Sequence, residues 1–251
     1  MTTREPCLQL DVGNSAAKWR LVSAGSVLAR GRYRPGDLAS RDVLLQATPA
    51  PRAIWVASVA APAAEAELAA LLSDHWHVVP WFARTAARTG DLENSYSDPS
   101  RMGVDRWLAM LGARARHTGR VCVVDAGSAL TIDIVSGGGC HEGGYIIPGP
   151  DLMERALLLD TDRVRFDESI DHDLTPGTST AQAVRHGIAL AQAGAVTLAL
   201  DAAGPEPPAL YFCGGAGKAL MALLDRGGTW APDLVFEGLE CMAAVAFDTG
   251  G

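Results

Sequence analysis

The sequence predicts an α/β protein made of two similar halves. Runs typical of strands and helices alternate along its 251 residues, and strands that end in Asp-x-Gly occur twice, at residues 10–15 (LDVGNS) and 124–129 (VDAGSA). Each of these turns opens a similar series of strands, so we interpret the two as an internal duplication. Such a duplication predicts two facing half-domains with a cleft between them.

The first half is expected to form an antiparallel meander that continues into an α/β arrangement. Strand-like runs occupy residues 7–12, 17–23, 27–33, 53–60 and 77–82. Helix-like runs occupy residues 63–75 and 104–117, and a polar, turn-rich stretch lies at 83–103. Pro80 places the last of these strands at an edge or an end of the sheet.

The second half repeats this pattern. Strand-like runs occupy residues 120–135 (two strands with a polar turn between them), 143–149, 209–213 and 233–238. Helix-like runs occupy residues 150–159, 179–203 and 218–226, with further helix at the end of the chain. We therefore expect an N-terminal domain at 1–117 and a C-terminal domain at 118–251.

Composition limits the classes of ligand and the location. The formal net charge is −8 with no cluster of Lys and Arg, which argues against a nucleic-acid partner. The five cysteines lack metal-ligand spacing, so we expect reduced, small apolar side chains. The N-terminal MTTREP has no apolar core of a signal peptide. The apolar window 187–203 contains Gln192 and Gly194 and favours a buried helix over a membrane span. A cytoplasmic protein without a membrane partner is expected.

The two Asp-x-Gly turns have the chemistry of a phosphate site. Glycine lets backbone N–H groups approach an anion closely, and Asn14, Ser15 and Ser128 add short donors. Lys18 offers a point charge to a phosphate. A carboxylate repels phosphate unless a cation lies between them, so each Asp predicts a metal ion. Tight-turn chemistry alone also explains these residues, and both interpretations stay open.

Two further motifs allow a functional and a structural interpretation. Residues 214–217 (GGAG) follow a strand, where they favour either a flat nucleoside against the backbone or a close strand–helix turn. Gly103-Val104-Asp105-Arg106 begins a helix, whose N-terminus attracts anions. Arg106 suits a carboxylate, and Asp105 suits the removal of a proton from a hydroxyl. Alternatively, Asp105 caps the helix and Arg106 forms a surface pair.

These motifs together resemble a known family. Their ordered set extends over nearly the whole chain, at residues 11–18, 94–107, 125–133, 143–149, 177–187 and 212–215. The chain resembles the acetate/sugar kinase, Hsp70 and actin superfamily and, more narrowly, the type III pantothenate kinases. Ser15 and Ser128 stand where that family usually has Thr, which keeps the hydroxyl.

The resemblance implies a fold and an activity. The fold would be two ribonuclease H-like (actin-like ATPase) half-domains with mixed β-sheets flanked by helices and an active-site cleft between them. The activity would be ATP-dependent phosphorylation of pantothenate to 4′-phosphopantothenate, the first step of coenzyme A biosynthesis. Two alternatives remain, namely a phosphohydrolase of the same superfamily and a non-enzymatic accessory factor in transcription.

The resemblance also implies site residues. The general base would be Asp105, and ATP would contact Asp11, Val12, Gly13, Asn14, Ser15, Ala16, Ala17, Lys18 and Ser128. Pantothenate would contact Tyr96, Gly103, Val104, Asp105, Arg106 and Thr180. Asp11 would hold Mg²⁺, and K⁺ or NH₄⁺ would lie near Asp125.

A homodimer is expected from the long helix that follows Thr180. This helix is apolar around much of its circumference, which requires burial on several sides. A second copy on a two-fold axis would cover one side and would bring Thr180 to its partner's pantothenate site.

Overall fold

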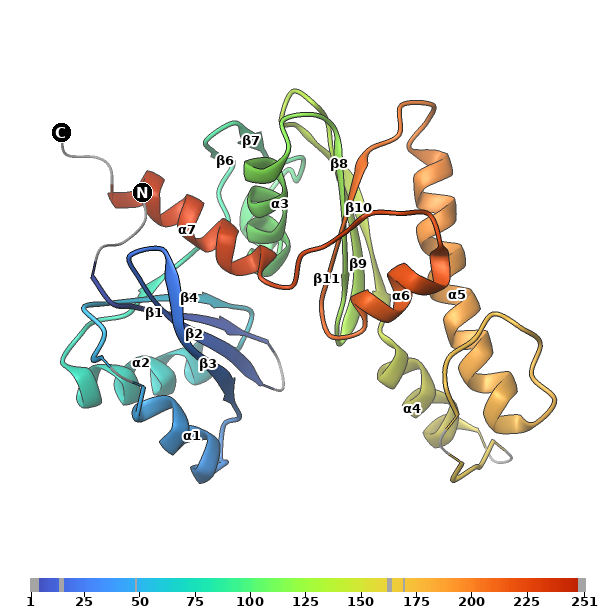
Figure 1. Cartoon of the computed structure of the whole chain (residues 1–251), viewed down its shortest axis with the longest axis horizontal. Helices are drawn as coiled ribbons and strands as arrows, with labels where there is room; N and C mark the ends of the chain where they lie inside the picture. Colours follow the sequence, from blue (N-terminus) through green and yellow to red (C-terminus); the bar gives the residue numbers. More distant parts are fainter. Residues whose placement is uncertain (1–4, 14–15, 48, 162–163, 169, 248–251) are drawn as a thin grey trace. The chain divides into compact units, whose positions relative to one another are not determined.

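A computed structural model describes residues 5–13, 16–47, 49–161, 164–168 and 170–247 (Figure 1). It contains mixed β-sheets flanked by helices, which confirms the predicted α/β class. The chain divides into two compact units: Met1–Ala115 together with Leu234–Gly251, and Arg116–Asp233.

The first unit contains a five-stranded sheet in the order β3-β2-β1-β4-β5. Its strands are β1 (Cys7–Val12), β2 (Ala17–Ser23), β3 (Ser26–Tyr33), β4 (Ala53–Ser58) and β5 (Trp81–Phe82). The first three form the predicted antiparallel meander, and β4 and β5 continue parallel to β1. The strand expected at 77–82 is confined to its last two residues, because His77 ends the preceding helix in a left-handed conformation.

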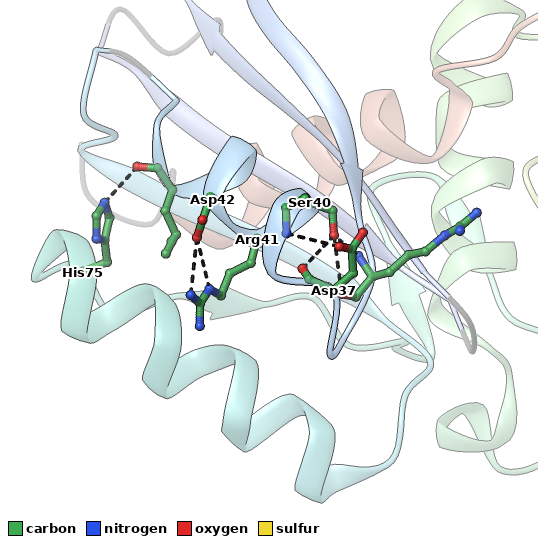
Figure 2. Close-up of polar contacts among 8 residues, drawn as sticks. Asp37, Ser40, Arg41, Asp42 and His75 are labelled. Atoms are coloured by element: carbon green, nitrogen blue, oxygen red, sulfur yellow. Dashed lines mark hydrogen bonds and ion pairs between the residues drawn. The ribbon is translucent and has the colours of Figure 1, made fainter.

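One face of this sheet packs against two helices, α1 (Leu38–Leu45) and α2 (Pro62–Trp76). Leu8 and Leu10 of β1 join Leu44 of α1 and Leu72 of α2 in one apolar cluster. The sequence analysis missed α1, a helix of only eight residues. Figure 2 shows the polar contacts at its two ends, where Ser40 Oγ donates to the Asp37 carbonyl and His75 Nε2 lies 2.8 Å from the Leu45 carbonyl oxygen.

The expectation of a strand at 233–238 was wrong, because these residues begin the helix α7 (Leu234–Phe247). The apolar stretch continues to Phe247, well past the length of a strand, and that length favours a helix. Within the first unit, α7 crosses α3 (Val104–Arg116) through two glycines. A Cβ on Gly112 would collide with the Leu234 carbonyl, and a Cβ on Gly238 would collide with the Leu108 carbonyl. The two helices thus approach backbone to backbone.

The second unit repeats the sheet in the order β10-β9-β8-β11-β12. Its strands are β8 (Val121–Ala126), β9 (Ala129–Val135), β10 (His141–Pro148), β11 (Ala209–Cys213) and β12 (Thr229–Trp230). Again the first three are antiparallel, and the last two run parallel to the first. Its helices are α4 (Pro150–Asp160), α5 (Thr180–Ala202) and α6 (Gly217–Leu224). The identical order and directions support the interpretation as a duplication.

The division into units differs from the expected domains 1–117 and 118–251 at the end of the chain. The change of unit after Ala115 lies close to the expected boundary, whereas α7 belongs to the first unit. There α7 contacts β1 and β4, and its Glu240 accepts hydrogen bonds from Gln9 and Arg20 of the sheet.

The long apolar helix α5 is only partly covered. By length and composition it passes the test for a membrane-spanning helix, a test that core helices of soluble proteins also pass, and 33% of its most apolar stretch is buried. Leu190 and Leu198 are 60% and 69% exposed. Among the described residues, one side of α5 therefore presents exposed apolar side chains.

Candidate active site

The first Asp-x-Gly turn lies at the edge of the first sheet where the parallel strands β1 and β4 both end. Val12 pairs with Ser58, and the Val59 N–H donates to the Val12 carbonyl at 3.0 Å. The Gly13 N–H donates to the Ala16 carbonyl at 3.1 Å and closes the turn, whereas the predicted site residues Asn14 and Ser15 lie outside the described residues.

Asp11 and Lys18 lie directly opposite each other on β1 and β2. Side chains of directly paired residues in antiparallel strands emerge on the same face of the sheet. Both are partly exposed. The turn therefore offers a carboxylate and an ammonium group side by side at the sheet edge.

The start of α3 reaches the same edge. A Cβ placed on Gly103 would lie 3.9 Å from Val59 Cγ1, so the segment that precedes α3 packs against the end of β4. The same Cβ would lie 2.5 Å from Asp105 Oδ1, which shows that this carboxylate is folded over Gly103. Within this unit, the structure brings the Asp11 turn and the Gly103–Asp105 segment to one edge of the sheet.

Arg106 does not lie at the surface, where the alternative to a role in substrate binding placed it. Its side chain is buried, its Nη1 donates to Tyr96 Oη at 2.9 Å, and its guanidinium lies 5.8 Å from the centre of the Tyr96 ring. Asp105 Oδ1 accepts a hydrogen bond from the backbone N–H of Arg106 at 2.8 Å. The carboxylate therefore also has a structural contact at the start of α3. Two predicted substrate residues, Tyr96 and Arg106, are thus joined by a direct hydrogen bond.

A cavity of about 410 Å³ opens beside this pair, lined by Tyr96, Ser97, Asp98 and Arg101. The last three were missed by the sequence analysis. Arg101 ends the short 3₁₀ helix η1 (Pro99–Arg101), which Asp98 caps by accepting the Ser100 N–H at 3.1 Å. These residues belong to a polar loop with a proline, and nothing in that sequence pattern predicts that its side chains line a cavity.

The stretch 83–96, which we call the strap, supports the start of α3 from outside. It contains two short strands, β6 (Arg88–Thr89) and β7 (Leu92–Glu93). Thr85 Oγ1 donates to the Met102 carbonyl at 2.9 Å, and Thr89 Oγ1 accepts Trp107 Nε1 at 3.2 Å. Near its end, Asn94 Oδ1 accepts the Tyr96 N–H at 2.9 Å. Thr85 and Thr89 of the strap thus each hold a residue at the start of α3 or just before it.

An ion pair anchors the beginning of the strap. The Arg84 guanidinium donates to both carboxylate oxygens of Glu65, at 3.0 and 2.5 Å. This hydrogen bonding by Arg84, with a smaller contribution from Ser58, lowers the pKa of the Glu65 carboxyl below its usual value. Ser58 is the last residue of β4, so the pair lies close to the same sheet edge.

The second turn has its own glycine-rich surroundings in the second unit. The Gly127 N–H donates to the Ala129 carbonyl at 2.9 Å, and the Gly149 N–H donates to the Ser128 carbonyl at 3.0 Å. Gly214 has φ +80°, and a Cβ there would collide with Asp125 Oδ1 and the Ala126 carbonyl. The structure therefore places the 214–217 cluster directly against the second turn. The Asp125 carboxylate lies near a backbone carbonyl, an arrangement of oxygen atoms that suits a cation.

Thr180 is the exposed first residue of α5. The preceding Ser179 caps this helix by accepting the Gln182 N–H at 3.2 Å. Arg185, one turn further on, donates to both oxygens of Glu154 and to the Ile170 carbonyl. The acidic segment before Thr180 is thereby fastened to α4 and α5.

Among the described residues, no three His, Cys, Asp or Glu side chains cluster as a metal site. Among these residues, a cation at Asp11 or Asp125 would have at most two such side chains as ligands, together with backbone or substrate oxygens. That fits Mg²⁺ in nucleotide sites, where the ion keeps water and binds phosphate oxygens.

Solved structures share the fold. A putative Baf family transcriptional activator from Campylobacter jejuni superposes with a TM-score of 0.60 at 23% identity and covers 94% of this chain and 96% of its own. A putative 2-dehydro-3-deoxygalactonokinase from Sinorhizobium meliloti gives 0.57 at 17% identity, over 96% and 99%. At these identities they show the fold alone, and with component A of a 2-hydroxyglutaryl-CoA dehydratase they confirm the expected ribonuclease H-like, actin-like ATPase class.

Sequence comparison identifies the family. A type III pantothenate kinase from Thiobacillus denitrificans is 38% identical over 237 residues, which cover 93% of this chain and 95% of the relative. One from Marinobacter nauticus is 37% identical over 245 residues, which cover 94% and 98%. The family model for type III pantothenate kinase matches residues 7–201. The expected resemblance is confirmed, and the chain belongs to the type III pantothenate kinase family.

Proposed function

We propose that the protein transfers the γ-phosphoryl group of ATP to the 4′-hydroxyl of pantothenate and so catalyses the first step toward coenzyme A. The observation that supports this most directly is the shared sheet edge in the first unit. There, a phosphate-binding type of turn with Asp11 and Lys18 lies at the same edge as the Asp105 carboxylate and the buried Arg106–Tyr96 pair.

The proposed mechanism assigns one step to each group. Asp105 orients the acceptor hydroxyl and takes its proton as the oxygen attacks the γ-phosphorus, while ADP leaves with the bridging oxygen. Arg106, fixed by Tyr96, and the backbone of Gly103 and Val104 hold pantothenate. Phosphoryl transfer needs mainly positioning and charge neutralisation, so one base and a few fixed donors suffice.

ATP is the donor in this proposal, and two kinds of cation assist it. Residues 11–18 and Ser128 contact its phosphates, with Lys18 as the point charge. Asp11 would hold Mg²⁺, which neutralises phosphate charge when bound. Asp125 would hold K⁺ or NH₄⁺, for which a lone carboxylate near a backbone carbonyl is a suitable environment.

The active unit in this proposal is a cytoplasmic homodimer, with Thr180 completing the neighbouring subunit's pantothenate site. The exposed leucines of α5 support a second copy as the covering surface. Mixing inactive Asp105→Asn subunits with inactive Thr180→Ala subunits should restore part of the activity, because half of the hybrid sites would be intact. An absence of rescue despite demonstrated subunit exchange would show that each subunit builds its own site.

The overall proposal is tested by ADP release measured with and without pantothenate. We expect ADP to form only when pantothenate is present. ADP formation that is independent of pantothenate would favour the phosphohydrolase alternative, and no ADP under either condition would favour a regulatory protein. The acidic composition and the carboxylates Asp11, Asp105 and Asp125 speak against the regulatory alternative.

A further inference from the structure

The peptide bond between Met102 and Gly103 is held from outside the segment that contains it. Thr85 Oγ1 donates to the Met102 carbonyl at 2.9 Å, and Thr85 itself is half-buried. Met102 is 2% exposed, and its N–H donates to the Pro99 carbonyl at 3.1 Å. The link between η1 and α3 is therefore fixed on both sides of Met102.

Fixing this carbonyl has a consequence for Gly103. A trans peptide is planar, with its C=O and N–H pointing in opposite directions, so the Thr85 hydrogen bond also sets the direction of the Gly103 N–H. Glycine has the greatest backbone freedom of any residue and so gains most from an external restraint. Gly103 is also the surface over which Asp105 folds its carboxylate.

Thr85 has a firm support of its own. The Ala83 N–H donates to the Val56 carbonyl at 2.8 Å and thereby extends the pairing of β4 with β5. Arg84 is tied to Glu65 of α2 through two hydrogen bonds. An unbroken series of contacts thus connects the first sheet to Thr85, from Thr85 to the Met102 carbonyl, and from there to Gly103 and Asp105.

We propose that Thr85 is a positioning residue for the phosphoryl transfer: its hydroxyl orients the Met102–Gly103 peptide and, through it, the Asp105 carboxylate. This inference rests on the proposed function, in which Asp105 is the general base. Thr85 acts without touching substrate. A misplacement of about 1 Å in a catalytic group can cost roughly 100-fold in rate, so a single remote hydrogen bond can matter.

The test uses two variants of Thr85 and one control variant. Thr85→Val removes the hydroxyl with little change in shape, and Thr85→Ser keeps a hydroxyl. Ser40→Ala removes a hydroxyl that donates to a backbone carbonyl in the same unit, at α1. We expect Thr85→Val to lower kcat by about 10-fold or more with KM for ATP unchanged. Thr85→Ser should stay within about threefold of the wild type, and Ser40→Ala should match it. If Thr85→Val fails to fold, Thr85→Ala replaces it.

Asp105→Asn, measured in parallel, separates this inference from the proposed function. If Asp105→Asn loses activity while folded Thr85→Val keeps the wild-type kcat, the positioning role is wrong and the general base stands. If Asp105→Asn turns over normally, the general base is wrong and the positioning role falls with it. Equal losses in Thr85→Ser and Thr85→Val would show that the hydroxyl is not the group that acts.

Discussion

The two Asp-x-Gly turns occupy equivalent places in the two sheets and differ in the side chain that lies opposite the carboxylate. Each ends the first strand of a five-stranded sheet, and in each the carbonyl after the Asp accepts an N–H from just beyond the next parallel strand: Val59 to Val12 at 3.0 Å, and Ala216 to Ala126 at 2.9 Å. Opposite the carboxylate, however, the first turn carries Lys18 and the second carries Thr131. The repeated architecture therefore places a lysine directly opposite the carboxylate in the first turn and a threonine there in the second.

This difference supports the division of labour proposed above, with phosphate and Mg²⁺ at the first turn and a monovalent cation at the second. A carboxylate beside an ammonium group suits a phosphate chain with its metal ion, because the carboxylate can bind the metal ion and the ammonium group can bind the phosphate oxygens. A carboxylate opposite a hydroxyl and near backbone carbonyls offers only oxygen atoms, as a monovalent cation requires. The predictions below are ordered from the largest expected effect to the smallest.

Replacing the side chain opposite the carboxylate should have a much larger effect in the first turn than in the second. We expect Lys18→Met to lower kcat/KM for ATP by about 10²–10³-fold, the usual loss when a charge-stabilising group is removed from a transition state. Thr131→Val at the equivalent position of the second turn should cost less than about 10-fold. Steady-state kinetics with varied ATP measures both variants. Similar losses in the two would contradict the division of labour.

Asp125 should govern the response to monovalent cations. We expect wild-type activity to require K⁺ or NH₄⁺ and to fall when Na⁺ replaces them, and we expect Asp125→Asn to lose this distinction. Asp11→Asn, the matched variant in the first turn, should lower the rate in all three salts alike. Rates of the wild type that are equal in K⁺, NH₄⁺ and Na⁺ would rule out a specific site.

The glycine cluster of the second unit provides a test of packing around Asp125. Gly214→Ala puts a Cβ against Asp125 Oδ1 at φ +80°, whereas Gly215→Ala meets no atom within 4 Å. Left-handed backbone at a non-glycine residue costs about 1–2 kcal/mol before the collision is counted. We expect Gly214→Ala to lower Tm by several degrees and to weaken ATP binding, and Gly215→Ala to resemble the wild type in thermal unfolding. An unchanged Tm in Gly214→Ala would show that this contact is not as the structure has it.

The smallest effect concerns an ion pair of the second unit. Hydrogen bonding by Arg185 lowers the pKa of the Glu154 carboxyl below its usual value. A lowered folded-state pKa adds stability above the unfolded pKa, and this stability is lost as the pH falls through the folded value. Glu154→Gln should therefore be less stable than the wild type at pH 7, with the gap shrinking as the pH falls below the usual glutamate pKa of about 4.3. The exposed control Glu67→Gln should show no such pH-dependent gap in urea unfolding.

Much of the fold could be predicted from the sequence, because the signals are local. The three-strand meanders follow from alternating runs and glycine turns, and α3 begins at Val104 as the Gly103-Val104-Asp105-Arg106 motif predicts. The strand expected at 233–238 failed because Val235 and Phe236 favour strands locally, while the glycine crossing with α3 fixes a helix. That crossing depends on residues more than a hundred positions apart, which local patterns do not reveal.

The charged residues of the candidate site could be predicted from the sequence, whereas the residues that hold them in place could not. Asp11, Lys18 and Asp105 stand out because carboxylates and a lysine interrupt apolar runs. Thr85 lies in a polar stretch that is typical of an ordinary loop, and only its hydrogen bond in the folded chain distinguishes it. Nor could the sequence tell that Arg106 would be buried against Tyr96 rather than exposed.

Phosphorus NMR of the reaction product tests the central claim most directly. ATP, Mg²⁺, K⁺ and pantothenate are incubated with the wild type and, in parallel, with Asp105→Asn. The account predicts that the wild type produces a new phosphomonoester on the primary hydroxyl of pantothenate together with an equal amount of ADP, and that Asp105→Asn produces neither at a comparable rate. Inorganic phosphate as the only new phosphorus species, or full product formation by Asp105→Asn, would contradict it.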